Sequence, residues 1–310
     1  MSLSAAQNPM RVPRPRGSPF GQRKVAVALN GFLFALPAVL LVGVVIMLPL
    51  GQAFYYSFTS WNGATANWTG LANYTNVLAD PELRRSFINS MLLFISVPFG
   101  LIPPFVIAYL LHKDIRGNKL FRAVIFAPTA LSWVVIGMVG RVFFSNQGPI
   151  NSLLALVGLG DAAPNWLADG NFALWAVILT FNAAIFGINT VIFLTGLATV
   201  DRSTIEAAWL DGAGEAQVLW YVIVPAMRRF IEFVLIITVI TSLTGLFGMI
   251  YVMTGGGPGS ATLTLDFAVW RRAFSTGAFG AGAAIGITLM VVTLVAIGLI
   301  RLLLRQRSEA

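Results

Sequence analysis

The chain has 310 residues, of which 57% are hydrophobic and only 10% are charged. Soluble domains carry about 25% charged residues, so the composition excludes an ordinary soluble protein and indicates an integral membrane protein. The lack of cysteine excludes disulfides and cysteine-based metal sites, and the net charge of +8 fits loop Lys and Arg that orient a membrane protein better than it fits nucleic-acid binding.

The N-terminal segment, residues 1–24, is basic and rich in proline. The apolar run after it is far longer than the core of a signal peptide, which spans about 7–15 residues, and it has no clear small-residue cleavage site. We therefore expect residues 1–24 to form a disordered cytoplasmic tail. Residues 25–305 are expected to form one transmembrane domain, and residues 306–310 a second cytoplasmic tail.

Six apolar runs separate the charged segments of the chain. They cover residues 25–58, 87–111, 123–140, 172–200, 233–253 and 277–300. A helix of about 20 apolar residues crosses a bilayer core of about 30 Å and satisfies its own backbone hydrogen bonds. The expected fold is therefore all-α, a polytopic membrane protein with six transmembrane helices.

The basic residues predict the orientation of these helices. With the N-terminus inside, 15 Lys and Arg residues fall on the cytoplasmic side and 5 on the outer side, which together are the 20 of the chain. Cytoplasmic loops carry an excess of Lys and Arg, so both termini are expected in the cytoplasm. The outer residues are Arg84, Arg85, Arg141, Arg271 and Arg272.

The outer segments contain local structure signals. Asp80 precedes Pro81, a typical helix start, and the apolar stretch 150–159 predicts a short helix along the membrane interface. Glycines 255–257 and Pro258 are expected to end any helix that continues from the fifth run.

The six runs contain essentially no ionisable residues, and the chain has no phosphate loop, HExxH motif or Ser/His/Asp set. We therefore predict that the chain is not an enzyme and holds no metal. Neutral polar groups do occur: Asn182 and Asn189 lie two helical turns apart with Phe186 between them, and Ser132 lies in the third run. Two readings stay open, a path for a hydroxyl-rich solute or hydrogen bonds between helices.

An acidic element, residues 201–229, lies in the cytoplasm by this topology. We expect a helix over 203–210 capped by Asp201 or Ser203, a turn at Asp211-Gly212, and a second helix over 214–223. Residues 201–227 hold four acids and one base, a net charge of −3, so an anionic leaflet would repel them. A helix that exposes Ile205, Ala208, Trp209 and Leu210 fits a basic, apolar-floored groove of a soluble partner; a purely structural hairpin is the alternative.

The same element carries a recognisable pattern. It reads Glu206-Ala207-Ala208, then Asp211-Gly212-Ala213 and, further on, Val224-Pro225. This pattern resembles the cytoplasmic signature of the inner-membrane permease subunits of ABC importers. The segments FTSWNG, GLANYTNVLADPE, IRGNKLFRAVIFAP, PNWLAD, NTVIFLTGLATV and YVMTGGGPGSATLTL resemble the carbohydrate-uptake branch, which includes maltose-type and glycerol-phosphate-type permeases. The resemblance covers residues 34–304.

The resemblance implies a type I importer permease fold in the bacterial inner membrane. It implies that the first cytoplasmic helix docks on a dimer of ATP-binding cassette ATPases, which bind ATP and Mg while this chain binds no cofactor. The residues that it assigns to coupling are Glu206, Ala207, Ala208, Asp211, Gly212 and Ala213. One departure from the pattern is Gly214, which stands where Ser or Thr often caps the second helix.

The resemblance also implies partners and a substrate path. The partners are a second homologous permease, an extracytoplasmic solute-binding protein, a carbohydrate and the lipid bilayer, with no nucleic acid. Asn189 matches an asparagine common in the fourth core helix, and Asn182 and Phe186 fall near the sugar-contact face. The alternatives are a permease for another polar solute, such as glycerol phosphate or a polyol, and a membrane scaffold without a transport role.

Overall fold

The computed structural model describes residues 20–113 and 118–306. The chain divides into two compact units, Met1–Gln52 and Ala53–Ala310. In the first unit, α1 (Phe20–Val42) runs through a π-helical turn, Gly43–Met47, into α2 (Leu48–Tyr56). Helix α1 thus begins inside the segment expected as a tail, of which residues 1–19 lie outside the described part. The side chains of residues 31–52 are apolar and mostly exposed, as a membrane span requires.

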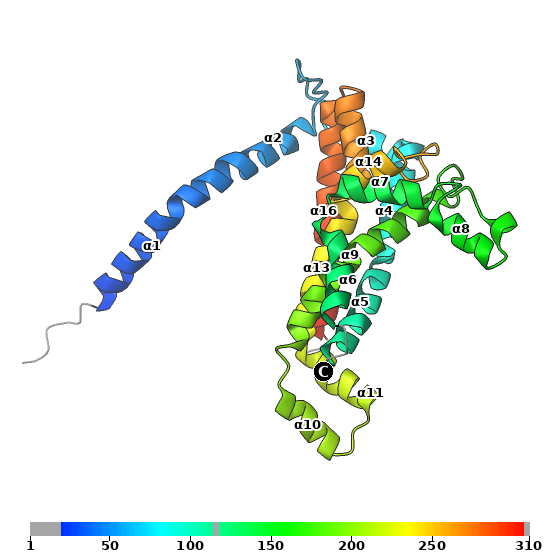
Figure 1. The fold of residues 1–310 in the computed structure, drawn as a ribbon. Helices are drawn as coiled ribbons and strands as arrows, with labels where there is room; N and C mark the ends of the chain where they lie inside the picture. The colour runs from blue at the N-terminus through cyan, green and yellow to red at the C-terminus, as the bar shows by residue number, and fades with distance from the viewer. Residues whose placement is uncertain (1–19, 114–117, 307–310) are drawn as a thin grey trace, which may run out of the picture. The chain divides into compact units, whose positions relative to one another are not determined.

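The second unit is built of helices joined by loops, and three of its spans are long and apolar enough to cross a membrane (Figure 1). The first joins α4 (Pro81–Ile95) to α5 (Val97–His112). The others are α9 (Ala173–Leu197) and α16 (Phe279–Gln306). With the span Gly31–Tyr56, the described residues hold four such spans, or up to six if two bent helix pairs each count as one.

The first bent pair corrects the expectation of a single helix over 123–140. Helix α6 (Asn118–Phe126) and a 3-10 turn, Ala127–Ala130, lead to α7 (Trp133–Phe143), and the two parts meet at 107°. Ser132 at the break is extended and its hydroxyl accepts a bond from the Val135 amide at 3.4 Å, so it caps α7. Since Pro128 lies in the turn before it, the helix cannot continue straight.

The second bent pair is α13 (Arg228–Thr244) and α14 (Phe247–Met253), which meet at 48°. Helices α7 and α14, the far halves of the two bent pairs, pack on each other. Gly137 makes this contact close, because a Cβ there would lie 2.6 Å from the carbonyl oxygen of Met249. The bends are therefore fixed by tertiary packing.

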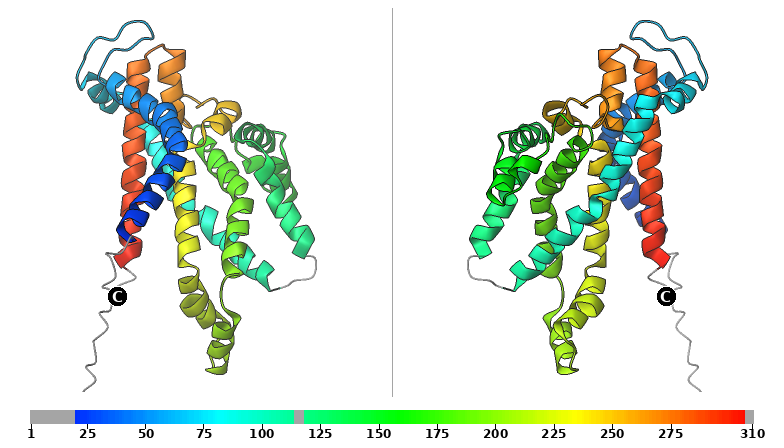
Figure 2. Two further views of the ribbon diagram at one scale, coloured as in Figure 1. Left: turned by 90° about the vertical axis from the view of Figure 1, so that its left-hand side faces the viewer. Right: turned by 90° about the vertical axis from the view of Figure 1, so that its right-hand side faces the viewer.

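Helix α9 is the centre of the second unit. It packs along α5 and against α13, and Figure 2 shows α9 and α13 side by side in both views. One buried cluster surrounds its first half and includes Phe181, and a second surrounds its last turns and includes Phe193 and Leu197. The second cluster continues into the acidic element through Val218 and Ile223, so that element is anchored to the helical core.

At the end of the unit opposite α10 (Arg202–Leu210) lie the short helices α3 (Ala72–Ala79) and α8 (Pro149–Leu156) (Figure 1). A third short helix, α15 (Leu265–Trp270), packs against α16 and α4. Asp80 caps α4 as predicted, accepting a bond from the Glu82 amide at 2.8 Å. Asp80 and Glu82 also form ion pairs with Arg272 and Arg271, respectively. These pairs tie the start of α4 to the segment before α16.

Asp266 holds the break of the fifth span. Its carboxylate accepts bonds from the Leu246 amide at 3.0 Å, the Phe267 amide at 2.9 Å and the Thr264 hydroxyl. Burial raises the pKa of Asp266, and these bonds act in the opposite direction. The sequence analysis did not select this residue, although an acid within the apolar stretch 263–270 is a usable signal.

Candidate functional site

The acidic element forms a helix–turn–helix that projects from the end of the second unit (Figure 1). Asp201, one of the two caps considered, is the residue that caps α10: its carboxylate accepts a bond from the Ser203 amide at 3.0 Å. The predicted first helix is confirmed, and it begins at Arg202, one residue earlier than expected.

The turn after α10 is a Schellman motif. The Ala213 amide donates to the Ala208 carbonyl at 3.0 Å, and the Gly212 amide donates to the Trp209 carbonyl at 3.0 Å. Gly212 has φ +85°, the left-handed conformation that favours glycine. The spacing of the signature therefore has a structural reason: Gly212 reverses the chain, and the amide after it then reaches back to the Ala208 carbonyl.

The two faces of α10 have different surroundings. Ile205 and Ala208, three residues apart, pack on the buried cluster that contains Val218. The expectation that both would be exposed is wrong, because a helix one turn from the core buries the face that meets it. Trp209 and Leu210 are exposed as predicted, at 54% and 89% of their surface. The exposed tip is thus one indole and one leucine at the end of a helix that is flanked by Asp201 and Asp211.

The remaining coupling candidates lie around this tip. Glu206 and Ala207 are exposed on α10, Asp211 and Gly212 are exposed in the turn, and Ala213 is partly buried. Glu206 also lines a pocket of about 290 Å³ with Tyr109 and His112 from the end of α5. The structure therefore brings the six residues together on one short segment.

The second helix, α11 (Glu215–Val218), continues into a π-helical turn, Leu219–Ile223. Gly214 precedes it without a capping side chain, but the Gln217 side chain accepts a bond from the Gly214 amide at 2.8 Å. Because Val218 and Ile223 are buried in the core, the weak cap is compensated by packing. The expected second helix, 214–223, is confirmed.

A polar contact that the sequence analysis missed joins this element to α5. Lys113 forms an ion pair with Glu215, and the Tyr109 hydroxyl donates to the same carboxylate at 3.3 Å. Both charged side chains are substantially exposed, so the pair adds at most about 1 kcal/mol. Its role is positional, since it fixes the start of α11 against the end of the second span.

Two of the candidate pathway residues make bonds between helices. Asn189 is 1% exposed and donates to the Gly100 carbonyl at 2.8 Å and to the Thr238 hydroxyl at 3.2 Å, joining α9 to α5 and α13. Asn182 donates to the Ser96 hydroxyl at 3.2 Å and to the Ile178 carbonyl at 2.8 Å. Both side chains therefore make hydrogen bonds between helices, which is one of the two roles left open by the sequence.

Of the candidate pathway residues, Asn182 has a buried side-chain atom without a hydrogen-bond partner in the described part of the chain. The Oδ1 atom of Asn182 is buried and has no hydrogen-bond partner within the described residues, and a Cβ at Gly100 would lie 2.8 Å from it. Phe186 is partly buried on the same helix, and Ser132 is exposed at the break between α6 and α7. Ser132 lies at the start of α7, whereas the other three residues lie on α9.

Metal-binding chemistry finds no support in residues 20–113 and 118–306. No three His, Cys, Asp or Glu side chains there lie close enough to hold an ion.

Comparison with known proteins covers most of the chain. It is 28% identical to the multiple sugar-binding transport system permease protein MsmF of Streptococcus mutans, over 87% of this chain and 93% of that protein. It is 30% identical to the sn-glycerol-3-phosphate transport system permease protein UgpA of Agrobacterium fabrum, over 85% of this chain and 90% of that one.

The fold is also similar to a solved structure, a chain of a bacterial ABC transporter involved in the import of the acidic polysaccharide alginate. The TM-score is 0.77 at 18% identity, covering 93% of this chain and 99% of that chain. Residues 77–309 match the family described as the binding-protein-dependent transport system inner membrane component. The chain therefore belongs to this family of ABC importer permeases, multi-pass membrane proteins that are transport components and not catalytic subunits.

Proposed function

We propose that this chain forms half of the translocation path of an ATP-driven importer for a neutral sugar or oligosaccharide, in the inner membrane of a bacterium. A second, related permease forms the other half. An extracytoplasmic binding protein delivers the solute, and a dimer of ATPase subunits, which carry ATP and Mg, drives the cycle. The similarity to MsmF supports a sugar importer, and the similarity in fold to a transporter of the polysaccharide alginate supports the importer architecture.

The observation that carries the proposal is the geometry of α10. Helix α10, flanked by Asp201 and Asp211, ends in a glycine-dependent reversal and presents Trp209 and Leu210 to solvent, while its opposite face is anchored in the core. Exposed aromatic and aliphatic side chains on a rigid support are typical of protein-binding surfaces. We infer that Glu206, Ala207, Ala208, Asp211, Gly212 and Ala213 couple the permease to the ATPase.

A phosphate ester would need a basic group at its site, and Arg141 is the basic residue near the outer end of the third span. Arg141, at the end of α7, donates to the Val252 carbonyl on α14 at 3.4 Å, so this guanidinium already has a structural partner, which favours a neutral solute. Glycerol phosphate remains the second candidate because UgpA is equally similar in sequence. The family assignment favours transport over the scaffold alternative.

Within the path, we propose that Ser132, Asn182, Phe186 and Asn189 contribute to solute passage. Asn182 is the strongest of the four, because its Oδ1 atom is unpaired in this conformation and can accept a hydroxyl if α5 and α9 separate. Asn189, with both amide hydrogens donated to neighbouring helices, also stabilises the helix packing.

The test is solute uptake by the full complex in proteoliposomes. Binding protein loaded with a labelled neutral sugar or with glycerol 3-phosphate is added outside, with ATP inside. We expect ATP-dependent uptake of the sugar and none of the phosphate ester. Uptake of the phosphate ester alone contradicts the substrate class, and uptake of neither solute in an ATP-hydrolysing complex contradicts both.

A further inference from the structure

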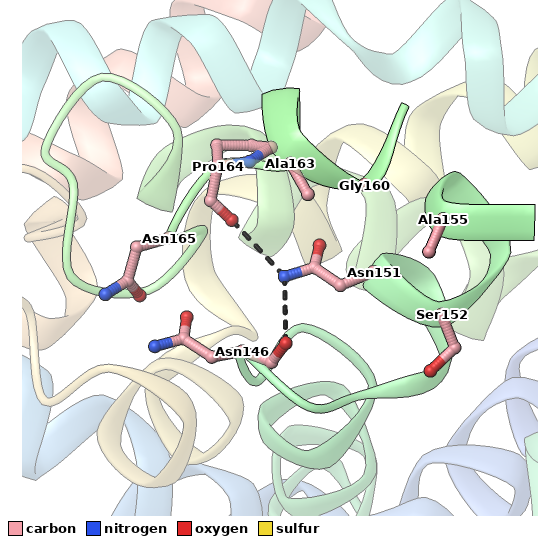
Figure 3. Close-up of a pocket in the computed structure, with 8 residues that line it drawn as sticks. All are labelled: Asn146, Asn151, Ser152, Ala155, Gly160, Ala163, Pro164 and Asn165. Carbon is pink, nitrogen blue, oxygen red and sulfur yellow. Dashed lines mark hydrogen bonds between the residues drawn. The ribbon is translucent and has the colours of Figure 1, made fainter. Parts of the chain in front are cut away.

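The segment between α7 and α9 folds into a pocket that the coupling element and the proposed path do not use. Its volume is about 490 Å³, within the range of roughly 300–1,000 Å³ common for small-ligand sites. Figure 3 shows its lining, which comes from the turn before α8, from α8 itself and from the loop that follows. This end of the unit lies opposite α10 (Figure 1).

One asparagine holds the pocket together. The Asn151 amide donates to the Asn146 carbonyl at 3.2 Å and to the Pro164 carbonyl at 3.5 Å (Figure 3). Its oxygen accepts a bond from the Trp166 indole at 2.8 Å. Since every polar atom of Asn151 is used within the protein, this side chain is structural and is not available to a ligand.

Two other asparagines supply free polar groups. The side-chain amides of Asn146 and Asn165 line the pocket from two different loop segments, and Figure 3 shows them on the same side of it. Throughout the described ranges, no protein group hydrogen-bonds to either amide, and both residues are exposed. Each amide can donate and accept, so together they offer donors and acceptors to a ligand in the pocket.

The charge of the pocket selects the class of ligand. All eight lining residues are uncharged, and Asp161, which follows the lining residue Gly160, is acidic. A phosphate ester or a uronic acid would meet no basic group and a neighbouring negative charge. A neutral, hydroxyl-rich molecule meets neither obstacle, and amide side chains match its hydroxyls.

We propose that this pocket binds one residue of an uncharged saccharide on the face of the permease opposite α10. Asn146 and Asn165 bind the hydroxyls, and Asn151 positions the two loops. The site is separate from Asn182 and Asn189, which lie within α9. This inference rests on the proposed function and narrows its substrate class to neutral sugars.

The test uses the assembled transporter in nanodiscs without binding protein and without ATP. Saturation-transfer NMR measures binding of maltose, trehalose and glycerol 3-phosphate. The variant combines Asn146→Ala with Asn165→Ala, and the matched control is Asn171→Ala, an exposed asparagine of the same segment that does not line the pocket. Losing two amide partners lowers the affinity about tenfold or more.

We expect a neutral disaccharide to bind the wild type and the Asn171→Ala control, the double variant to lose that binding, and the phosphate ester to bind none of them. Equal binding by the double variant and the control overturns the pocket assignment. A double variant that keeps disaccharide binding but, when unliganded binding protein is then added, has lost affinity for that protein also overturns it, since the surface is then a protein contact.

Uptake in proteoliposomes separates this inference from the proposed function. If a neutral sugar is transported but no disaccharide contacts the pocket, only the pocket inference fails. If the transporter carries glycerol 3-phosphate alone, the proposed function fails, whatever binds at Asn146 and Asn165.

Discussion

The reversal at Gly212 allows a substitution that changes one backbone conformation and little else. Gly212 has φ +85°, and a Cβ added there would have no heavy atom within 4 Å. Gly212→Ala therefore causes no clash. Its cost comes from the left-handed conformation, which is unfavourable for a residue with a Cβ.

That cost is about 1–2 kcal/mol. Because the Schellman bonds from Gly212 and Ala213 hold only this turn, the penalty falls on the position of the tip and not on the helical core. If the tip must be in this conformation to bind the ATPase, the affinity falls by about 5–30-fold. Gly212→Asn should lose less, since asparagine tolerates this conformation better.

The measurement is the affinity of the purified permease pair for its ATPase subunits, together with ATP-dependent uptake. Gly158→Ala is the matched control. Gly158 has φ +81° with no heavy atom within 4 Å of its Cβ, and it ends α8 with the same pair of bonds. We expect Gly212→Ala to weaken both readouts and Gly158→Ala to weaken neither. Equal effects of the two variants, or unchanged affinity in Gly212→Ala, refute the role assigned to the turn.

Three further predictions concern separate parts of the molecule. Glu206→Lys should weaken ATPase binding and remove its salt dependence, because the acidic element is expected to face a basic groove. A variant that binds the ATPase as tightly as the wild type at both low and high salt contradicts this. Asn189→Ala should lower the free energy of unfolding by about 1 kcal/mol through its two lost interhelical bonds, while Asn182→Ala should reduce uptake with a smaller effect on stability. Normal uptake in the combined variant would mean that these residues only pack. Asp266→Ala should cost about 2 kcal/mol because three donors lose their acceptor, whereas Asp169→Ala, at a loop carboxylate bonded to one amide, should cost less; thermal unfolding in detergent measures both.

The acidic element could be predicted because its signals are local. A capping aspartate, an Asp-Gly turn and a buried second helix are set by neighbouring residues, so the pattern gave helices within a few positions of α10 and α11. Which face of α10 is buried depends on the distant core, and the prediction for Ile205 and Ala208 failed there.

The bends of the third and fifth spans could not be predicted from apolar runs alone. Hydropathy sets how many residues can cross a membrane, but not whether the helix stays straight. Pro128 marks the break before α7 locally, but the direction of α7 after its 107° turn depends on close packing of Gly137 against Met249, more than 100 residues along the chain. The Lys113–Glu215 pair, separated by 102 residues, was missed for the same reason.

The central claim is that the tip of α10 contacts an ATPase subunit. The chain contains no cysteine, so a single introduced thiol is unique. Leu210→Cys places it at the tip, where Leu210 is 89% exposed, and Leu156→Cys places it on α8, where Leu156 is 83% exposed at the opposite end. The account predicts that a short thiol–amine cross-linker joins Leu210→Cys, and not Leu156→Cys, to the ATPase in the assembled transporter. No cross-link from Leu210→Cys, or an equal yield from both positions, contradicts it.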